Sequence, residues 1–240
     1  MKPIAIFQHT EVGAPGSIPA LLNELGLASQ RVPIVDGAAV PQDASQFAGL
    51  VLMGGYMSVH DDLPWIGEEL LLIQQAVQQG IPVIGHCLGS QLLATALGAQ
   101  VTRNAQPEMG WNRIAAASNR QAQEWFGPQA GQELLTFQWH GDTFGIPPGA
   151  ERIASSVYCE NQAFVVDGLH LGIQSHLEMT PELISLSVER NGHQLEKQQA
   201  AGNPACSPLA DVLQDLPQRT DQMRATLKQL YQRWVRDLKH

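Results

Sequence analysis

The chain has 240 residues, of which 44% are hydrophobic, and can therefore bury one sizeable core as a single α/β domain or at most two small ones. The net charge is −9 and the 14 Lys and Arg residues are scattered, which argues against binding to nucleic acid or to an anionic membrane surface. Three cysteines, Cys87, Cys159 and Cys206, are too few for a disulfide scaffold and are typical of a reducing compartment.

The N-terminal residues lead directly into a strand-like run, and they show no signal-peptide pattern. No uninterrupted apolar stretch approaches the roughly 20 residues that a membrane-spanning helix needs. We therefore expect a soluble, cytoplasmic protein that does not enter a membrane.

The first part of the chain alternates apolar runs with segments of helical spacing. Strands are expected over residues 4–7, 31–35, 47–53 and 81–84, and helices over 17–25, 64–79 and 91–97. Strands separated by helices of these lengths indicate β-α-β units in a doubly wound, mainly parallel sheet with flanking helices. In such a sheet the crossovers are right-handed and the functional site lies at the carboxyl ends of the strands.

After residue 98 the pattern changes to short strands separated by turns. Strands are expected over residues 99–103, 111–115, 134–139, 152–155, 163–166 and 169–174. They indicate added or antiparallel strands beside the parallel core. From about residue 181 helices are expected over 181–190 and 209–238, separated by a loop at 203–208. We expect one domain over residues 1–240 with a helical C-terminal segment.

A glycine-flanked cysteine lies where the strand at 81–84 gives way to a helix. Gly85 and Gly89 bracket Cys87 in the G-x-C-x-G pattern of a cysteine nucleophile elbow. Without Cβ atoms at these two positions, strand and helix can approach closely while the cysteine adopts a strained backbone conformation. Free N–H groups at the start of the helix favour a thiolate. The alternative is a structural cysteine in the core, the commoner fate of a lone cysteine, but the flanking glycines favour a nucleophile.

A thiolate nucleophile usually needs a base, and the base needs a group that orients it. Of the eight histidines, only His176 is followed by a carboxylate at a suitable spacing, Glu178. If the strand at 169–174 continues through these residues, they share one face, about 7 Å apart at Cα. A hydrogen bond between them would fix the imidazole tautomer and stabilise the imidazolium. From these residues alone, a pair of ordinary surface side chains remains the alternative.

Two other histidine clusters have simpler explanations than a metal site. His60, Asp61 and Asp62 are consecutive and cannot all point at one ion, so turn chemistry before the helix at residue 64 explains them better. His140 ends an expected strand and could line the site or be a structural histidine. No phosphate-binding loop or G-x-G-x-x-G follows a strand, so no nucleotide site is indicated.

Several motifs together resemble one family. Residues 85–94, Gly-His-Cys-Leu-Gly-Ser-Gln-Leu-Leu-Ala, resemble the nucleophile segment of the class I glutamine amidotransferases, which use a Cys-His-Glu triad. His176-Leu-Glu178 matches the family's short His-x-Glu motif. The segment 108–111, Glu-Met-Gly-Trp, resembles one common in stand-alone members. The similarity covers roughly residues 51–178, and the helical tail carries no motif.

The resemblance also implies roles for substrate-binding residues. Residues 52–58, Leu-Met-Gly-Gly-Tyr-Met-Ser, resemble the family's Gly-Gly loop, which implies that the Gly55 N–H contributes to an oxyanion hole. The Leu88 N–H would be the second donor, and Gln91 matches a glutamine that contacts bound substrate. The sequence departs from the family at Tyr56, where many members have proline. Ser175 likewise replaces a frequent aromatic residue, and Leu177 replaces the commonest proline.

The function implied by the resemblance is hydrolysis of the glutamine side-chain amide through a thioester on Cys87. His176, oriented by Glu178, would transfer the protons, and no metal or organic cofactor is needed. The partners implied are glutamine, or a γ-glutamyl compound, and a separate synthase subunit that receives the ammonia. The alternatives are a free-standing γ-glutamyl peptidase or hydrolase, and a regulatory binding module without turnover. The sequence does not determine the ammonia acceptor or the oligomeric state.

Overall fold

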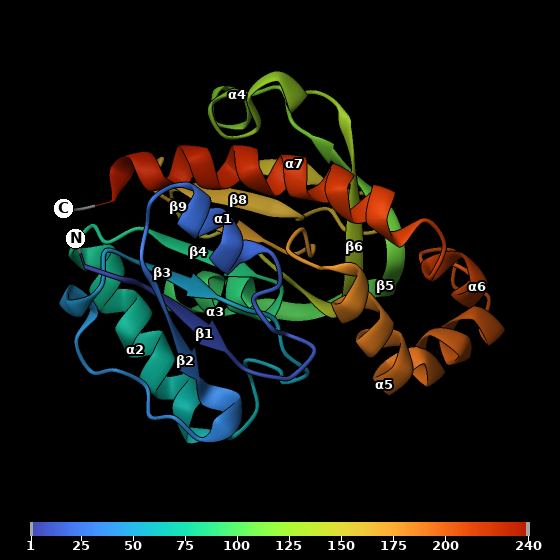
Figure 1. The fold of residues 1–240 in the computed structure, drawn as a ribbon, viewed down its shortest axis with the longest axis horizontal. Helices are drawn as coiled ribbons and strands as arrows, with labels where there is room; N and C mark the ends of the chain where they lie inside the picture. The colour runs from blue at the N-terminus through green and yellow to red at the C-terminus, as the bar shows by residue number, and fades with distance from the viewer. Residues whose placement is uncertain (1, 239–240) are drawn as a thin grey trace.

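The computed structural model describes residues 2–238. Its central element is one mixed β-sheet (Figure 1). Its strand order is β2-β1-β3-β4-β9-β8-β7-β5-β6. Over the described residues the strands are β1 (Ile4–Gln8), β2 (Ser29–Pro33), β3 (Gly49–Leu52), β4 (Val83–His86), β5 (Val101–Ala116), β6 (Glu133–Phe144), β7 (Glu151–Ser155), β8 (Ala163–Val166) and β9 (His170–Ile173).

Helices cover both faces of this sheet. Within residues 2–238 the α-helices are α1 (Ile18–Glu24), α2 (Pro64–Gln78), α3 (Leu88–Ala96), α4 (Arg120–Phe126), α5 (Pro181–Ala200), α6 (Leu209–Val212) and α7 (Leu216–Trp234). None of the helices in this range combines the length and the apolarity that crossing a membrane requires.

The sheet divides into a parallel half and an antiparallel half. Strands β2, β1, β3, β4 and β9 pair in parallel, and β8, β7, β5 and β6 continue the sheet with antiparallel pairs. Every residue of β1, β3 and β4 is buried, as expected for parallel strands covered on both faces. The predicted fold class, a mainly parallel core with flanking helices and added antiparallel strands, is confirmed.

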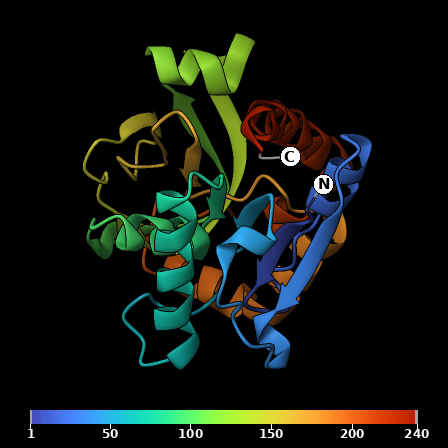
Figure 2. The same ribbon diagram turned by 90° about the vertical axis from the view of Figure 1, so that its left-hand side faces the viewer.

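Alternate residues of the parallel strands enter two separate cores. In β1, Ile4 and Ile6 belong to the core that α1, α4 and α7 cover, whereas Ala5 and Phe7 belong to the core under α2 and α3. This alternation follows from the two-residue period of a strand. Figure 2 shows α7 nearly end-on beside α1, on one side of the sheet.

Several expected strand boundaries are wrong. The strands predicted at 99–103 and 111–115 are parts of the single strand β5, whose pairing with β6 shifts register between Arg103 and Glu108. Pro107 lies inside this irregular stretch, where a missing N–H breaks no ladder bond. In addition, β4 begins at Val83 rather than at residue 81 and continues through Gly85 to His86, so α3 starts directly after Cys87.

The condition under which His176 and Glu178 would share a strand face, a continuation of β9 through residue 178, is not met. The strand ends at Ile173, whose carbonyl accepts the Cys87 N–H at 2.9 Å, because its partner β4 ends there. His176 instead forms an isolated bridge with Phe137 of β6, with backbone hydrogen bonds of 2.8 and 3.2 Å. The segment that carries the predicted base therefore leaves the parallel half and reaches the antiparallel half.

The helical tail is longer and more divided than expected. Helix α5 extends to Ala200, and the helix predicted over 209–238 is split into α6 and α7 at Asp215, whose φ is 50°. Helix α4 was not predicted; the Asn119 side chain caps it by accepting the Ala122 N–H at 2.9 Å. The single domain over 1–240 stays a prediction, and residues 1, 239 and 240 lie outside the described range.

Candidate active site

Cys87 lies at the turn between β4 and α3, at the carboxyl end of the parallel strands. Its backbone has φ 50° and ψ −112°, a conformation that L-residues rarely adopt. The flanking glycines are required by contact: a Cβ on Gly85 would lie 2.4 Å from the Gly89 carbonyl oxygen, and a Cβ on Gly89 would lie 2.1 Å from the Leu52 carbonyl oxygen. The turn therefore has the close packing that the sequence pattern predicted.

His176 and Glu178 form a buried pair beside this cysteine. The imidazole Nδ1 lies 2.7 Å from Glu178 Oε1. The ring also reaches the nucleophile, since a Cβ built on Gly54 would lie 2.8 Å from His176 Cε1 and 3.5 Å from Cys87 Cβ. The structure thus brings together Cys87, His176 and Glu178, although the pair lies outside the strand that was expected to carry it.

The electrostatics of this pair favour an imidazolium and a carboxylate. Burial opposes the charged form of His176, but the Glu178 carboxylate and the Cys87 thiolate outweigh it and raise the imidazole pKa well above its usual value. Burial likewise opposes the charged form of Glu178, yet the His176 charge holds the pKa of the carboxyl below its usual value. The histidine can therefore carry a proton next to the sulfur.

The family resemblance implied that the backbone N–H groups of Gly55 and Leu88 form an oxyanion hole, and the structure places these two residues in contact with each other. Gly55 packs against Leu88, so that a Cβ on Gly55 would lie 2.9 Å from Leu88 Cδ2. Within residues 2–238, Gly55 N–H has no hydrogen-bond acceptor. Leu88 is the first residue of α3, and an N–H at that position has no acceptor within its helix. Their role as oxyanion donors stays a prediction.

Gln91 is held in place by β6 and by the segment that follows β9. Its side-chain amide donates to the Asp142 carbonyl at 3.3 Å and to Gln174 Oε1 at 3.1 Å. The residue lines the same cleft as Cys87. Its predicted contact with substrate stays a prediction.

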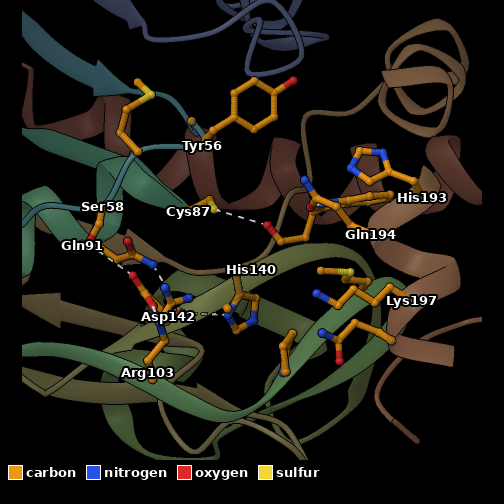
Figure 3. A pocket seen from close by; sticks show the side chains of 17 residues that line it. Tyr56, Ser58, Cys87, Gln91, Arg103, His140, Asp142, His193, Gln194 and Lys197 are labelled. Atoms are coloured by element: carbon orange, nitrogen blue, oxygen red, sulfur yellow. Dashed lines mark hydrogen bonds and ion pairs between the residues drawn. The ribbon is translucent and has the colours of Figure 1, made fainter. Parts of the chain in front are cut away.

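Cys87 opens into a cleft of about 460 Å³ (Figure 3). The cleft lies between the Gly55–Ser58 loop, strands β5 and β6, and helix α5. Its charged and ionisable lining side chains, apart from Cys87, are Tyr56, Arg103, His140, Asp142, His193 and Lys197. Figure 3 shows that His193, Gln194 and Lys197 come from α5 and lie across the cleft from Ser58 and Gln91. A volume of this size accommodates a small organic substrate.

A smaller cavity of about 40 Å³ adjoins the same cysteine and is lined by His176. Its other lining residues include Thr10, Gly13 and Asn191. A cavity needs only about 10–15 Å³ of such space to hold a water molecule, so this one has room for at least one water. The sulfur therefore borders both a space large enough for substrate and a space suited to a small nucleophile.

Sequence reasoning missed the cleft wall formed by α5. His193 and Lys197 stand in a polar helical stretch without a motif, and nothing in their local pattern indicates a site. The helix is also tied to the opposite lip of the cleft, since Asn191 Nδ2 donates to the Tyr56 hydroxyl at 3.2 Å. Many members of the family have proline at the position of Tyr56. The tyrosine hydroxyl of this chain therefore forms a hydrogen bond between the two walls of the cleft that a proline could not form.

His140 lines the cleft from within β6, and it does not end that strand as expected, since β6 continues to Phe144. Its Nε2 lies 3.0 Å from Glu108 Oε2. The Cys159 sulfur is close enough that the three residues could present ligand atoms within 4.8 Å of one another. The Glu108 oxygens, however, already accept from Ser156 and Gln162. Burial, moreover, raises the pKa of the Cys159 thiol to about 11. The cluster functions as a hydrogen-bond network.

The other suspected metal sequence forms a turn. The Asp61 carboxylate accepts the Ser58 N–H at 2.9 Å, and His60 Nε2 lies 2.9 Å from the Val101 carbonyl oxygen. These contacts hold the loop before α2 against the start of β5.

A further buried histidine–glutamate pair, also missed, lies behind the Gly-Gly loop. His9 Nε2 is 3.1 Å from both carboxylate oxygens of Glu69 on α2, and Nδ1 is 2.9 Å from the Met53 carbonyl oxygen. Burial opposes the charge, but Glu69 outweighs it and raises the pKa of His9. The pair thus holds the backbone of Met53, the residue before Gly54, in place.

Comparisons with known proteins agree with this geometry. The family described as "Glutamine amidotransferase class-I" matches residues 15–194. The solved structure of a glutamine amidotransferase from Methylobacillus flagellatus superposes with a TM-score of 0.95 at 37% identity, covering 100% of this chain and 96% of that one. The glutamine amidotransferase-like protein YfeJ of Salmonella typhimurium is 32% identical over 66% of this chain and 68% of its own length.

Two further relatives carry more specific names. The glutamine-hydrolysing GMP synthase of Alkalilimnicola ehrlichii is 32% identical over 55% of this chain, and the match spans only 26% of that synthase. The γ-glutamyl peptidase 4 of Arabidopsis thaliana is 26% identical over 71% of this chain and 70% of the peptidase.

Proposed function

Because the chain belongs to the class-I glutamine amidotransferase family, we propose that it hydrolyses the side-chain amide of glutamine through a thioester on Cys87. The ammonia released is supplied to a synthase on a separate chain. The observation that carries the proposal is the buried His176–Glu178 pair, joined at 2.7 Å, set against a cysteine at a strained strand-to-helix turn.

In the first half of the reaction the Cys87 sulfur attacks the amide carbon, forming a C–S bond. The carbonyl oxygen takes up negative charge and accepts from the N–H groups of Gly55 and Leu88. His176 gives its proton to the amide nitrogen, the C–N bond breaks, and ammonia leaves. Glu178 stabilises the imidazolium throughout and keeps the ring oriented.

In the second half water attacks the thioester carbon. His176, now neutral, accepts a proton from this water, and the small cavity next to its ring is a suitable position for the molecule. The C–S bond breaks, the thiolate reforms, and glutamate leaves. Every step uses side chains and backbone groups of this chain, and no step calls for a metal or an organic cofactor.

A synthase partner is supported by the relative that is named a glutamine-hydrolysing GMP synthase, because this chain matches only 26% of that protein's length. The proposal assigns the role of the unmatched part of that synthase to a separate chain.

A second candidate is a γ-glutamyl peptidase, which uses the same thioester and releases an amine instead of ammonia. The relative of that name and the size of the cleft beyond Cys87 favour it. A third candidate, a regulatory module without turnover, is opposed by the grouping of Cys87 with a histidine of raised pKa and its carboxylate.

Side-by-side assays test the proposal. Ammonia release from glutamine and amino-acid release from γ-glutamyl dipeptides are measured with the purified chain, using Cys87→Ala to subtract background. We expect kcat/KM for glutamine to exceed that for the dipeptides. A tenfold preference for the dipeptides, about 1.4 kcal/mol of transition-state discrimination, would establish the peptidase instead. If neither substrate is turned over, by the chain alone or with a synthase, the result would favour the regulatory module.

A further inference from the structure

A second histidine, His86, lies against the oxygen of Glu178 that His176 does not use. Its Nδ1 is 3.5 Å from Glu178 Oε2, and both side chains are completely buried. Across residues 2–238 neither of these two atoms has a hydrogen-bond partner. A buried polar atom without a hydrogen-bond partner destabilises the fold, so closing this short gap is favourable for both atoms.

The other nitrogen of His86 is bound by the C-terminal helix. His86 Nε2 lies 3.0 Å from the Tyr231 hydroxyl on α7, and the two rings stack with centroids 6.1 Å apart. Within the described part of the chain this is the one hydrogen bond of that hydroxyl. Helix α7, which carries no sequence motif, thus reaches the back of the candidate site.

The direction of these hydrogen bonds follows from the carboxylate of Glu178, which can only accept. Burial lowers the pKa of His86 to about 4, so the ring is neutral and has one N–H. A carboxylate only accepts, so that N–H belongs on Nδ1, facing Glu178. The Nε2 lone pair then accepts from Tyr231, whose pKa burial and Glu178 raise well above its usual value, so the hydroxyl keeps its proton.

We propose that His86 and Tyr231 are positioning residues for the reaction of Cys87. Tyr231 fixes the tautomer of His86, and His86 holds Oε2 of Glu178 so that Oε1 stays on His176. The proposal rests on the function proposed above.

The titratable groups around Glu178 come from three parts of the fold. His176 lies two residues before it in the chain and His86 comes from β4. Tyr231 comes from α7 and is itself influenced by the Glu178 charge. Cys87 acts through His176. Ser17, at the start of α1, bonds only to the Glu178 backbone carbonyl. A change at Tyr231 therefore reaches the reaction through His86, Glu178 and His176.

The first test compares Tyr231→Phe with Thr220→Val. The Phe variant loses one oxygen, and the control loses a hydroxyl on the same helix that bonds to the Leu216 and Pro217 carbonyls. We expect Tyr231→Phe to lower kcat for glutamine about tenfold with KM within about twofold. The alkaline limb of kcat should move to lower pH, because a less firmly held Glu178 lowers the pKa of His176. Thr220→Val should leave both unchanged.

The second test uses His86→Gln and His86→Leu. Glutamine keeps an N–H that can donate to Glu178, whereas leucine fills the space without a donor. We expect Gln to retain at least about tenfold more of kcat than Leu. Equal kcat and equal pH profiles in the two variants, or a Tyr231→Phe enzyme identical to the parent chain, would overturn the proposal.

A third readout does not depend on turnover. The rate at which iodoacetamide alkylates Cys87 is followed against pH for the parent chain, Tyr231→Phe and Thr220→Val. We expect slower alkylation at acid pH in Tyr231→Phe alone. If the parent chain hydrolyses no γ-glutamyl amide, the proposed function is wrong. The pH profile of Cys87 alkylation still tests whether Tyr231 has the positioning role. An unchanged profile overturns that role even where glutamine is hydrolysed.

Discussion

Two buried histidine–glutamate pairs lie on either side of the Gly54–Gly55 loop, and they differ in what the second ring nitrogen meets. In the His9–Glu69 pair, Nε2 faces the carboxylate and Nδ1 faces the Met53 carbonyl oxygen, so both nitrogens are committed to fixed acceptors. In the His176–Glu178 pair, Nδ1 faces the carboxylate and the other edge of the ring faces Cys87.

The comparison shows that a raised histidine pKa does not by itself mark a reacting group. In both pairs burial opposes the charge and a carboxylate overcomes it. His9 also stacks on Trp65, with ring centroids 5.0 Å apart, and is closed in by α2. His176 lines a cavity next to the sulfur. Access to a nucleophile, and not the protonation state, separates the proposed reacting pair from the structural one.

Removing the sulfur should have the largest effect. Cys87→Ala eliminates the thioester, so glutamine turnover should fall by more than about 10⁴-fold. The far-ultraviolet circular dichroism and the melting temperature should stay close to those of the parent chain, because alanine fits the same turn. Cys159→Ala is the control, and comparable activity in the two variants would remove Cys87 from the mechanism.

Neutralising each carboxylate in turn should separate the two pairs. Glu178→Gln should lower kcat about tenfold or more, since it removes the charge that stabilises the His176 imidazolium. Glu69→Gln should keep kcat within about threefold but lower the melting temperature by about 6 °C or more, because it leaves a buried imidazolium unpaired. A Glu178→Gln enzyme with only a raised KM would contradict the assignment.

The three cysteines should differ in their rate of alkylation, and this effect should be smaller than the effects of Cys87→Ala and Glu178→Gln on turnover. Burial raises the pKa of the Cys159 thiol to about 11 and also raises that of Cys206, so both should react slowly. Peptide mapping after brief iodoacetamide treatment near pH 6.5 should find Cys87 labelled at least about tenfold faster. Glu178→Gln should slow this labelling and Glu69→Gln should not. Preferential modification of Cys159 or Cys206 would argue against the proposed nucleophile.

The smallest expected effect is a pH dependence of stability from His9. Its folded-state pKa is raised above 6.5, so the stability it contributes is fully present below pH 6.5 and is lost as the pH rises through the folded-state pKa. Urea unfolding should therefore show a wider gap between the parent chain and His9→Gln at pH 6 than at pH 9. A gap that widens at pH 9 would show that His9 is buried as the neutral ring.

Local sequence was enough to predict much of the parallel half. The strand-turn-helix at Cys87 requires Gly85 and Gly89, and the structure shows the close contacts at both positions. The alternation of apolar runs and helical segments predicted the parallel core. These features depend on residues within a few positions of one another, where steric and hydrogen-bonding constraints act directly on the chain. His176 and Glu178, two residues apart, could be suggested as a pair for the same reason.

Only the tertiary structure determined what surrounds those residues. His86 meets Tyr231 across 145 positions, and His9 meets Glu69 across 60. The pairing of His176 with Phe137 replaced the expected strand, because the end of β4 removed the partner that β9 needed. Helix α5 became a wall of the cleft without any local signal. Such contacts form when separate elements bury their apolar faces against each other. The local sequence of one element does not determine which other element will pack on it.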